Sequence, residues 1–405
     1  MSDPSVLIAG ASIAGPALAY WLGRSGWRTT VLERAPALRR GGQNVDLRGA
    51  GLQVVRRMGL EERLRAVRRA EFGLEFVGPA GQVIARFPVG DSSALSLTAE
   101  LEVMRGDLTE LLVEATAATA EYRFGDRITA VRQEDDAALV SFAQAPPERF
   151  DLVVAADGIG STTRRLVCGD RPVVRSLGVE ATWATIPRAD GDSDWWQLFH
   201  APGGSISLRP DPYGTTSVVI TRTLARGDRP EAGERRAPAQ QRAVLRRTFS
   251  GAGWQTDRVL DALQDVEELY AVEVGQVSAP RWSRGSVVPL GDAACCPSPI
   301  TGMGTTLAVV GAYVLAGEIT SRTALPDGLA GYERIMRPWV ERVQKLPPGV
   351  PRIANSTSRA GVALLRSVVR AAGTPSGRWV SDRLRRSSPA DEPFELPRYA
   401  GLDSP

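Results

Sequence analysis

VLIAGASIAG, at residues 6–15, places four apolar residues directly before a glycine-bearing turn. An Ala- and Leu-rich segment with helical character follows, and a second apolar strand, Thr29–Leu32, ends at Glu33. A strand, a glycine turn, a helix and a second strand ending on a carboxylate are typical of a βαβ dinucleotide-binding unit. The stretch therefore predicts an α/β fold with a Rossmann-like parallel sheet.

Each residue type in this turn has a physical reason. Gly10 permits the tight turn, and Gly15 lets the helix pack closely on the strand, so that a pyrophosphate meets the helix N-terminus. Glu33 is expected to accept hydrogen bonds from the ribose hydroxyls of an adenosine. Ser12 replaces the middle glycine of the usual pattern. By itself the segment fits NAD as well as FAD, and similar turns without a ligand also occur in α/β folds.

A second segment, residues 150–158, favours flavin. It reads FDLVVAADG, an apolar strand that ends on Asp157 and Gly158, and the pair Arg164-Arg165 follows shortly after it. Ligands of open α/β sheets gather at the carboxyl ends of the strands. We therefore expect Asp157 to contact the cofactor or to shape its cleft.

A third segment, residues 285–294, again runs from a strand into Gly291-Asp292. The loop after it contains Gly302 and Gly304 and leads into a predicted helix at 305–319. Asp292 is expected to bind the ribityl hydroxyls, and the two glycines leave room for a planar ring. The positive end of the helix dipole would stabilise an anionic reduced flavin.

With these three motifs, residues 5–345 resemble the single-component FAD aromatic hydroxylases, a family that includes para-hydroxybenzoate hydroxylase and the tetracycline-inactivating monooxygenases. Arg105 in Met104–Leu108 matches the family's Arg-x-x-Leu helix start, whose arginine reaches FAD. The segment from Gly41 to Asp46 is similar to the one that borders the isoalloxazine ring, with Arg39 or Arg40 near the docking place of NADPH or NADH. The cofactor-binding residues predicted in this way are Gly10, Ser12, Ile13, Ala14, Gly15, Glu33, Arg34, Asp46, Arg105, Asp157, Gly291, Asp292, Gly302, Met303, Gly304 and Thr305.

Two departures from the family pattern affect the active site. Cys295 stands where the family often has histidine, and Thr305 and Thr306 stand where it often has asparagine. Flavin binding should tolerate both changes, so they bear on the substrate. No residue is predicted to be catalytic by itself.

The predicted organisation interleaves two domains. The FAD-binding domain comprises residues 1–71, 101–172 and 281–345, and the substrate domain comprises residues 72–100 and 173–280, whose alternating patterns predict an antiparallel sheet that roofs the flavin. Residues 346–405 form a C-terminal helical segment, with an amphipathic helix at 358–372. A loop at 226–239 is expected to lead into a helix at 240–248.

Composition excludes several other classes. The chain has 405 residues, is 43% hydrophobic and 23% charged, and has three cysteines and one histidine. Its basic residues, nearly all arginines, are scattered, which argues against nucleic-acid binding. Neither a disulfide framework nor a metal site is expected, and neither a signal peptide nor a membrane-spanning run is recognised. These features predict a cytoplasmic enzyme, and the oligomeric state stays open.

The predicted roof is rich in aromatic side chains, which are more often core residues than ligand contacts. His200 is the only histidine and is flanked in the sequence by Trp196 and Phe199. It is a candidate to form a hydrogen bond with a phenolic substrate, although a purely structural histidine fits equally well. Arg209 and Tyr213 are the other candidate substrate residues.

No second glycine-rich βαβ unit is present to hold NADPH or NADH, an absence that the resembled family shares. The resemblance implies that the nicotinamide cofactor docks transiently and reduces the flavin. The reduced flavin then forms a C4a-hydroperoxide, which hydroxylates an aromatic, phenolic or polycyclic small molecule.

Several alternatives remain open at this point. The same scaffold supports Baeyer-Villiger oxidation or epoxidation, and a flavin-carrying protein that binds a drug-like aromatic without turnover is a further class. A flavin-dependent halogenase is disfavoured because Lys345 is the only lysine and lies past the last flavin motif. The sequence decides neither between NADH and NADPH nor which substrate is used.

Overall fold

A computed structural model describes residues 3–39, 42–67, 72–88, 101–169, 173–225, 228, 236–267, 269–346, 349, 354–377 and 394–402. The strands are β1 (Ser5–Ala9), β2 (Arg28–Glu33), β3 (Asn44–Leu47), β4 (Gly73–Val77), β5 (Val83–Pro88), β6 (Leu101–Met104), β7 (Ala120–Phe124), β8 (Ile128–Glu134), β9 (Ala137–Phe142), β10 (Glu148–Phe150), β11 (Leu152–Ala155), β12 (Val174–Pro187), β13 (Trp196–Ala201), β14 (Gly204–Pro210), β15 (Thr215–Thr223), β16 (Tyr270–Val277) and β17 (Val287–Pro289). The helices are α1 (Ala14–Arg24), α2 (Ala50–Arg57), α3 (Glu61–Val67), α4 (Arg105–Thr116), α5 (Arg165–Cys168), α6 (Pro238–Phe249), α7 (Thr256–Ala262), α8 (Asp292–Cys295), α9 (Gly304–Thr320), α10 (Leu325–Val343) and α12 (Arg359–Ala372), with a 3₁₀ turn at Pro299–Thr301.

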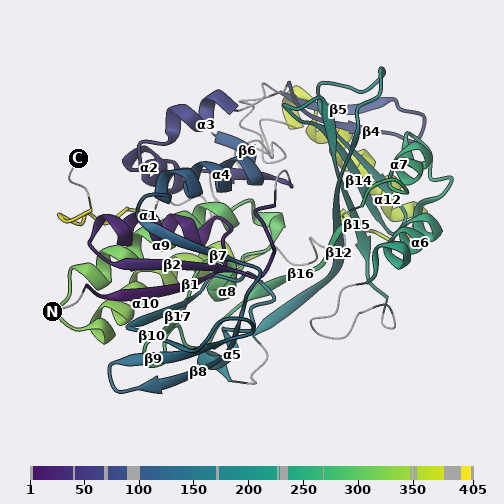
Figure 1. Ribbon diagram of the computed structural model, residues 1–405. Coiled ribbons are helices and arrows are strands. Elements are labelled where there is room, and N and C mark those ends of the chain that lie inside the picture. Colours follow the sequence, from purple (N-terminus) through teal and green to yellow (C-terminus); the bar gives the residue numbers. More distant parts are fainter. Residues whose placement is uncertain are drawn as a thin grey trace.

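A parallel sheet of the order β17-β11-β1-β2-β7 forms the centre of one half of the molecule (Figure 1). The three strands β1, β11 and β17 are almost wholly apolar and buried along their whole length because both of their faces are covered. In β1, Leu7 pairs with Val153 of β11 and with Thr30 of β2. The predicted strands around residues 6–9, 29–32, 152–155 and 287–289 are confirmed, and so is the parallel Rossmann-like sheet.

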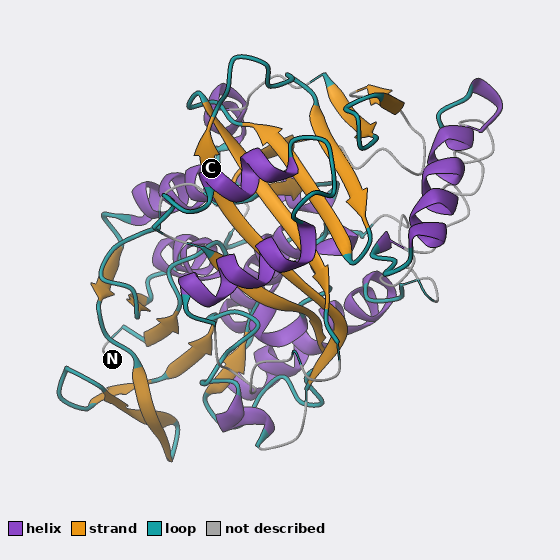
Figure 2. Cartoon of the chain, turned by 90° about the vertical axis from the view of Figure 1, so that its right-hand side faces the viewer, coloured by secondary structure: helices purple, strands orange, loops and turns teal. Residues whose placement is uncertain are grey.

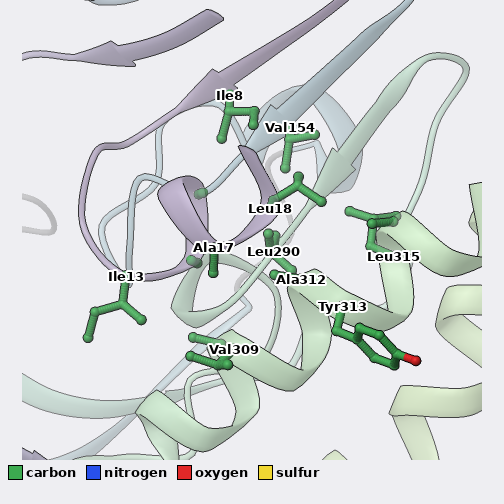
Figure 3. Packing of buried hydrophobic residues seen from close by; sticks show 14 of the residues in the cluster. Ile8, Ile13, Ala17, Leu18, Val154, Leu290, Val309, Ala312, Tyr313 and Leu315 are labelled. Carbon is green, nitrogen blue, oxygen red and sulfur yellow. The ribbon is translucent and has the colours of Figure 1, made fainter. Parts of the chain in front are cut away.

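The core of this half lies between the sheet and two helices. Figure 3 shows Leu18 of α1 between Ile8 and Val154 of the sheet and Ala312 of α9. Because α9 is apolar on nearly all sides, it is buried between α1, α2 and α10. A small sheet, β10-β9-β8, was not predicted from the sequence and contributes residues such as Val140 to the same core.

A seven-stranded sheet, ordered β16-β12-β15-β14-β13-β4-β5, forms the other half. It is antiparallel except where β4 pairs in parallel with β13, so the expectation of an antiparallel sheet is corrected at that pairing. No hairpin joins β4 to β13, because they come from distant parts of the chain, and a turn therefore does not fix their relative direction.

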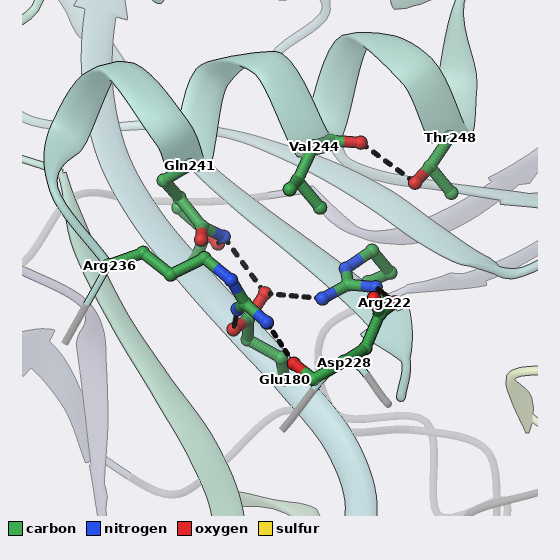
Figure 4. Close-up of polar contacts among 8 residues, drawn as sticks. Glu180, Arg222, Asp228, Arg236, Gln241, Val244 and Thr248 are labelled. Carbon is green, nitrogen blue, oxygen red and sulfur yellow. Dashed lines mark hydrogen bonds and ion pairs between the residues drawn. The ribbon is translucent and has the colours of Figure 1, made fainter. Parts of the chain in front are cut away.

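Helices α6 and α7 cover the outer face of this sheet, which faces the viewer in Figure 2. Leu245 and Phe249 of α6 pack there against Phe199, Ile206 and Val218. Figure 4 shows a buried polar cluster under α6, in which Glu180 accepts hydrogen bonds from Gln241 at 2.9 Å and from Arg222 at 3.3 Å, and also one from Arg236. Polar contacts as well as apolar packing thus hold α6 on the sheet.

Successive residues of a strand alternate between the two faces of a sheet. The residues that do not face α6 and α7 therefore lie on the opposite face, which we call the inner face. Arg209 of β14 reaches Glu102 of β6 from this face. Helix α12, which confirms the helix predicted at 358–372, covers part of the same face with Leu365 and Val369, against Leu74 and Phe76. The uncovered remainder of the inner face faces the other half of the molecule.

The last described segment, residues 394–402, returns to the first half of the molecule. Phe394 stacks on Trp339 with 4.2 Å between ring centroids, and the Tyr399 hydroxyl donates to Glu318 at 2.9 Å. No helix within the described ranges is long and apolar enough to cross a membrane. The domain boundaries given above stay a prediction.

Candidate active site

Four strands of the parallel sheet end at one edge, and the chain places its three motifs there. Gly10 follows β1, Glu33 ends β2, Asp157 follows β11, and Gly291 follows β17. Because all four strands run in the same direction, segments that are far apart in the sequence meet at this edge.

The turn after β1 is closely packed, and side chains would not fit in it. Gly10 has a φ of +119°, and a Cβ atom there would lie 2.4 Å from the carbonyl oxygen of Ala156. A Cβ atom at Gly15 would lie 2.0 Å from the carbonyl oxygen of Gly10. The backbone can therefore approach a ligand closely here, and the first amides of α1 have no partner within the helix. These properties fit a pyrophosphate.

Glu33 and Arg105 both form hydrogen bonds with this turn. Glu33 accepts hydrogen bonds from the Ala11 amide at 3.0 Å and from the Ala35 amide at 2.9 Å. Arg105, the first residue of α4, donates to the Ser12 hydroxyl at 3.1 Å. Burial lowers the pKa of Arg105, with a smaller contribution from Arg39 nearby. The guanidinium thus has little water around it, so an anion beside it would be strongly stabilised.

Asp157 organises its own loop. It accepts hydrogen bonds from the hydroxyls of Ser161 and Thr163, the latter at 3.1 Å. Arg164 is buried and donates to the carbonyl oxygens of Ile159 at 2.9 Å and Ala293 at 3.1 Å. This guanidinium joins the Asp157 loop to the segment after Gly291. The sequence predicts no role for Arg164, and the nearness of this residue to Asp157 in the chain is its only signal there.

Asp292 follows Gly291 and begins α8. The residue is exposed to solvent, yet the surrounding protein desolvates the carboxyl enough to raise its pKa. A Cβ atom at Gly304 would lie 3.7 Å from Asp292 Oδ1, and one at Gly291 would lie 2.9 Å from the Ala14 Cβ atom. The third motif therefore lies against the first, as the dinucleotide assignment requires.

The loop before α9 contacts β3. A Cβ atom at Gly302 would lie 2.8 Å from Asp46 Oδ2, and Arg48 donates to the same carboxylate oxygen at 2.7 Å. Burial, followed by the charge of Glu102, raises the pKa of Asp46 to about 7. Thr306 accepts a hydrogen bond from the Arg48 amide at 3.0 Å. Met303 directly precedes α9, and Thr305 lies in its first turn. Arg34, which follows β2, is exposed.

Arg209 connects the inner face of the large sheet to this region. Its guanidinium contacts Glu102 and lies 4.6 Å from the centroid of the Trp196 ring. Ser217, which pairs with Arg209 in the sheet, is buried, and its hydroxyl has no hydrogen-bond partner. Buried polar groups without a partner are rare in proteins. The Ser217 hydroxyl is therefore a polar group of the inner face that the protein itself does not satisfy.

The other two predicted substrate residues lie apart from Arg209. His200 is buried and parallel to the Phe76 ring at 5.9 Å, and burial lowers its pKa to about 4, so it is neutral at pH 7. Tyr213 lies in the turn after β14 and donates to Asp107 of α4 at 2.5 Å. Arg40 and Gly41 lie outside the described residues, whereas Arg39 is described and exposed.

All three cysteines are buried thiols. Burial raises the pKa of Cys295 and Cys296 above the ordinary range for thiols, so both are protonated at neutral pH. Within the described ranges, no group of His, Cys, Asp and Glu side chains is arranged to bind a metal ion.

The comparisons with known proteins agree with this geometry. The FAD binding domain family matches residues 3–346. The flavin-dependent monooxygenase eupH of a Phoma species is 38% identical over 432 residues, with 99% of each chain covered.

Two crystal structures extend the comparison. The tetracycline destructase Tet(55) has a TM-score of 0.81 at 29% identity, with 98% of this chain and 99% of that chain covered. PqsL of P. aeruginosa in complex with 2-aminobenzoylacetate has a TM-score of 0.66 at 25% identity, with 90% and 100% covered. The resemblance predicted from the motifs is confirmed: the chain belongs to the FAD-dependent monooxygenases related to para-hydroxybenzoate hydroxylase.

Proposed function

We propose that this flavoprotein uses NADPH or NADH to hydroxylate an aromatic, phenolic or polycyclic small molecule. The observation that carries the proposal is the meeting of the three motifs at one sheet edge, opposite a second sheet whose inner face presents aromatic and polar side chains. A site between two such walls excludes water from the reacting groups. Bound FAD would supply the redox and oxygen chemistry. The protein would position the substrate against the flavin, provide charged groups near it and keep water out of the site.

The residues predicted from the sequence are proposed to hold FAD from end to end. Glu33 would bind the adenosine ribose, and the turn from Gly10 to Gly15 with Arg105 would bind the pyrophosphate. Asp292, at the carboxyl end of β17, would bind the ribityl chain. Gly302 and Gly304 leave space for the ring beside Asp46. The contacts among these residues support one continuous site.

The substrate is proposed to lie against the inner face of the seven-stranded sheet. Trp196 and Trp183, both partly buried, offer flat apolar surface there. The guanidinium of Arg209 is already engaged by Glu102 and Trp196, so it would orient the substrate from a fixed position. The names of the solved relatives, a tetracycline destructase and an enzyme with bound 2-aminobenzoylacetate, support a substrate that contains an aromatic ring.

The His200 side chain is proposed only as part of the inner face of the seven-stranded sheet, with no role in proton transfer. Its ring lies parallel to Phe76 and remains neutral down to about pH 4, so it is a poor proton acceptor at physiological pH. Tyr213, engaged with Asp107, would hold the end of the sheet against α4.

The test is an anaerobic spectrum of the FAD-loaded protein, before and after NADPH or NADH, with a panel of phenolic and polycyclic compounds. We expect the oxidised-flavin absorbance to bleach, and one compound class to accelerate bleaching. After ¹⁸O₂ is admitted, mass spectrometry should find one labelled hydroxyl oxygen in that compound. Label in a lactone or an epoxide would assign the reaction to Baeyer-Villiger oxidation or epoxidation. Failure of both nucleotides to bleach the flavin would contradict the proposal.

A further inference from the structure

Four charged side chains lie together between the two-stranded sheet β3-β6 and strand β14. Asp46 of β3 and Glu102 of β6 are directly opposite each other, so their side chains lie on the same face of this small sheet. Arg48 donates to Asp46 at 2.7 Å, and Arg209 of β14 forms an ion pair with Glu102. The exposed fractions of the side chains are 12% for Asp46, 14% for Glu102 and 9% for Arg209. We call these four residues the charge cluster.

Arg209 is held on several sides within this cluster. Its guanidinium carbon lies 4.6 Å from the centroid of the Trp196 ring, within the range of a cation–π contact. When the Asn44 amide is oriented so that its oxygen faces a donor, this oxygen accepts from Arg209 Nε at 2.6 Å and from Nη1 at 3.0 Å. The position of the guanidinium is therefore set by the protein itself.

The charge cluster borders the proposed place of the flavin ring. A Cβ atom at Gly302 would lie 2.8 Å from Asp46 Oδ2, and the Thr306 hydroxyl accepts from the Arg48 amide at 3.0 Å. Gly302 and Thr306 belong to the segment that leads into α9, beside which the proposed function places the ring. A substrate between this ring and the inner face would therefore lie close to Arg209.

The inner face around Arg209 is otherwise uncharged. Among the inner-face residues of β13, β14 and β15, all of which the structure describes, the others are apolar, aromatic or hydroxyl-bearing. His200 is among them and is neutral at pH 7. Trp196 donates to the Ser207 hydroxyl at 2.5 Å. A ligand on these strands therefore meets one cation, aromatic rings and neutral hydroxyl groups.

The carboxylates of the charge cluster already compensate this cation. Two carboxylates and two guanidinium groups are packed together, and even so burial and the charge of Glu102 raise the pKa of Asp46 to about 7. A third carboxylate at this place would lose its water and be repelled by Glu102. A neutral carbonyl, amide or hydroxyl oxygen meets neither cost and needs only a hydrogen-bond partner.

We propose that Glu102 determines the substrate specificity of this site. By binding Arg209 it excludes aromatic compounds that carry a ring carboxylate, and the site takes uncharged aromatic compounds whose oxygen atoms accept hydrogen bonds from Arg209. This inference rests on the proposed function and narrows its substrate class. Glu102 acts through Arg209 and is a positioning residue, with no part in the redox chemistry.

The experiment measures the binding of two matched pairs of compounds to the FAD-loaded protein at neutral pH, from the change in the flavin absorbance spectrum. The pairs are 4-hydroxybenzoate with 4-hydroxybenzamide, and 3-hydroxy-2-naphthoate with 3-hydroxy-2-naphthamide. In the parent protein the amide should bind about 10-fold more tightly than the acid, because the acid must bury an uncompensated charge. In Glu102→Gln the acid should gain about 10-fold or more, because Arg209 can then bind its carboxylate.

Further variants separate this role from a general effect. Glu102→Asp keeps the charge and should keep the preference for the amide. The double variant Glu102→Gln with Arg209→Met should lose the gain in acid binding, since the cation that binds the acid is absent. Glu121→Gln removes a carboxylate that binds another arginine, Arg123, in the parallel sheet, and should change neither affinity. If Glu102→Gln does not retain FAD, Asp46→Asn removes the other carboxylate of the cluster and should shift the acid-to-amide ratio in the same direction.

Equal affinities of acid and amide in the parent protein, or an unchanged ratio in Glu102→Gln, would overturn the proposal. Failure of all four compounds to perturb the flavin of either protein would also overturn it. Binding is measured without a reductant, so these outcomes do not depend on the nucleotide. If neither NADPH nor NADH bleaches the parent flavin while the preference still switches in Glu102→Gln, the proposed function fails and the selectivity assigned to Glu102 stands.

Discussion

Two glycines decide how close the chain can come to a ligand at the first turn. A Cβ atom at Gly15 would overlap the Gly10 carbonyl oxygen at 2.0 Å, so Gly15→Ala forces α1 away from β1. We expect a loss of about 1–3 kcal/mol in unfolding free energy, as for other overpacked sites, together with weaker FAD retention. Urea unfolding and the flavin content of the purified variant measure both effects. Gly191→Ala, where nothing lies within 4 Å of the added Cβ atom, is the control.

Asp46 makes stability depend on pH. Its pKa in the fold is about 7 against an ordinary 3.8, so the folded protein binds the proton more tightly than the unfolded chain does. The contribution of Asp46 to the free energy of unfolding therefore falls by on the order of 4 kcal/mol as the pH rises from about 4 to about 7. Above that range this contribution is constant. Asp46→Asn should lack this slope.

Urea unfolding from pH 4 to 8 measures the difference between parent and Asp46→Asn proteins. Asp265→Asn, at an exposed position after α7, controls for the loss of one carboxylate. A difference between Asp46→Asn and the parent that stays constant over the whole pH range would contradict the assignment.

At the scale of elements, Arg164 links the two loops that we propose to bind FAD. Its guanidinium joins the loop after β11 to the start of α8 through two carbonyl oxygens. Arg164→Met keeps the volume of the side chain but removes both hydrogen bonds, so we expect at least a tenfold rise in the Kd for FAD. Arg165→Met changes the exposed neighbour and should have no effect. Equal FAD affinities of the two variants would show that the loops hold their positions without Arg164.

Helix α6 depends on the polar cluster in Figure 4. Glu180 is buried and serves Arg222, Arg236 and Gln241 together. Glu180→Gln leaves two guanidinium groups with less compensating charge, and breaking a buried pair in this way costs about 3–5 kcal/mol. Thermal unfolding measures the loss, and Glu110→Gln at an exposed site is the control. A shift no larger than that of the control would mean that water reaches the cluster.

Across the whole molecule, local sequence patterns were enough to predict the features located at the carboxyl ends of the parallel strands. Gly10, Asp157 and Gly291 each follow an apolar strand, and parallel strands bring their ends together, so the meeting of the three motifs could be predicted. The same holds for α9 and α12, whose apolar patterns are long and regular.

What could not be predicted depends on contacts between distant segments. The parallel pairing of β4 with β13, the return of Tyr399 to Glu318 and the link from Arg164 to Ala293 leave no periodic trace in the sequence. The same is true of Tyr270 and Trp183, which read as ordinary strand residues until the sheet register places them side by side. Side-chain partners of this kind are set by packing, which a single sequence does not encode locally.

The central claim is that one FAD molecule spans the edge where the three motifs meet. Equilibrium titration of the flavin-free chain with FAD, followed by flavin fluorescence, tests it most directly. We expect one FAD per chain, and a Kd raised at least tenfold in both Glu33→Ala and Asp292→Ala, at opposite ends of the site, with Arg165→Met unchanged. Parent-like affinity in both Glu33→Ala and Asp292→Ala would contradict the account.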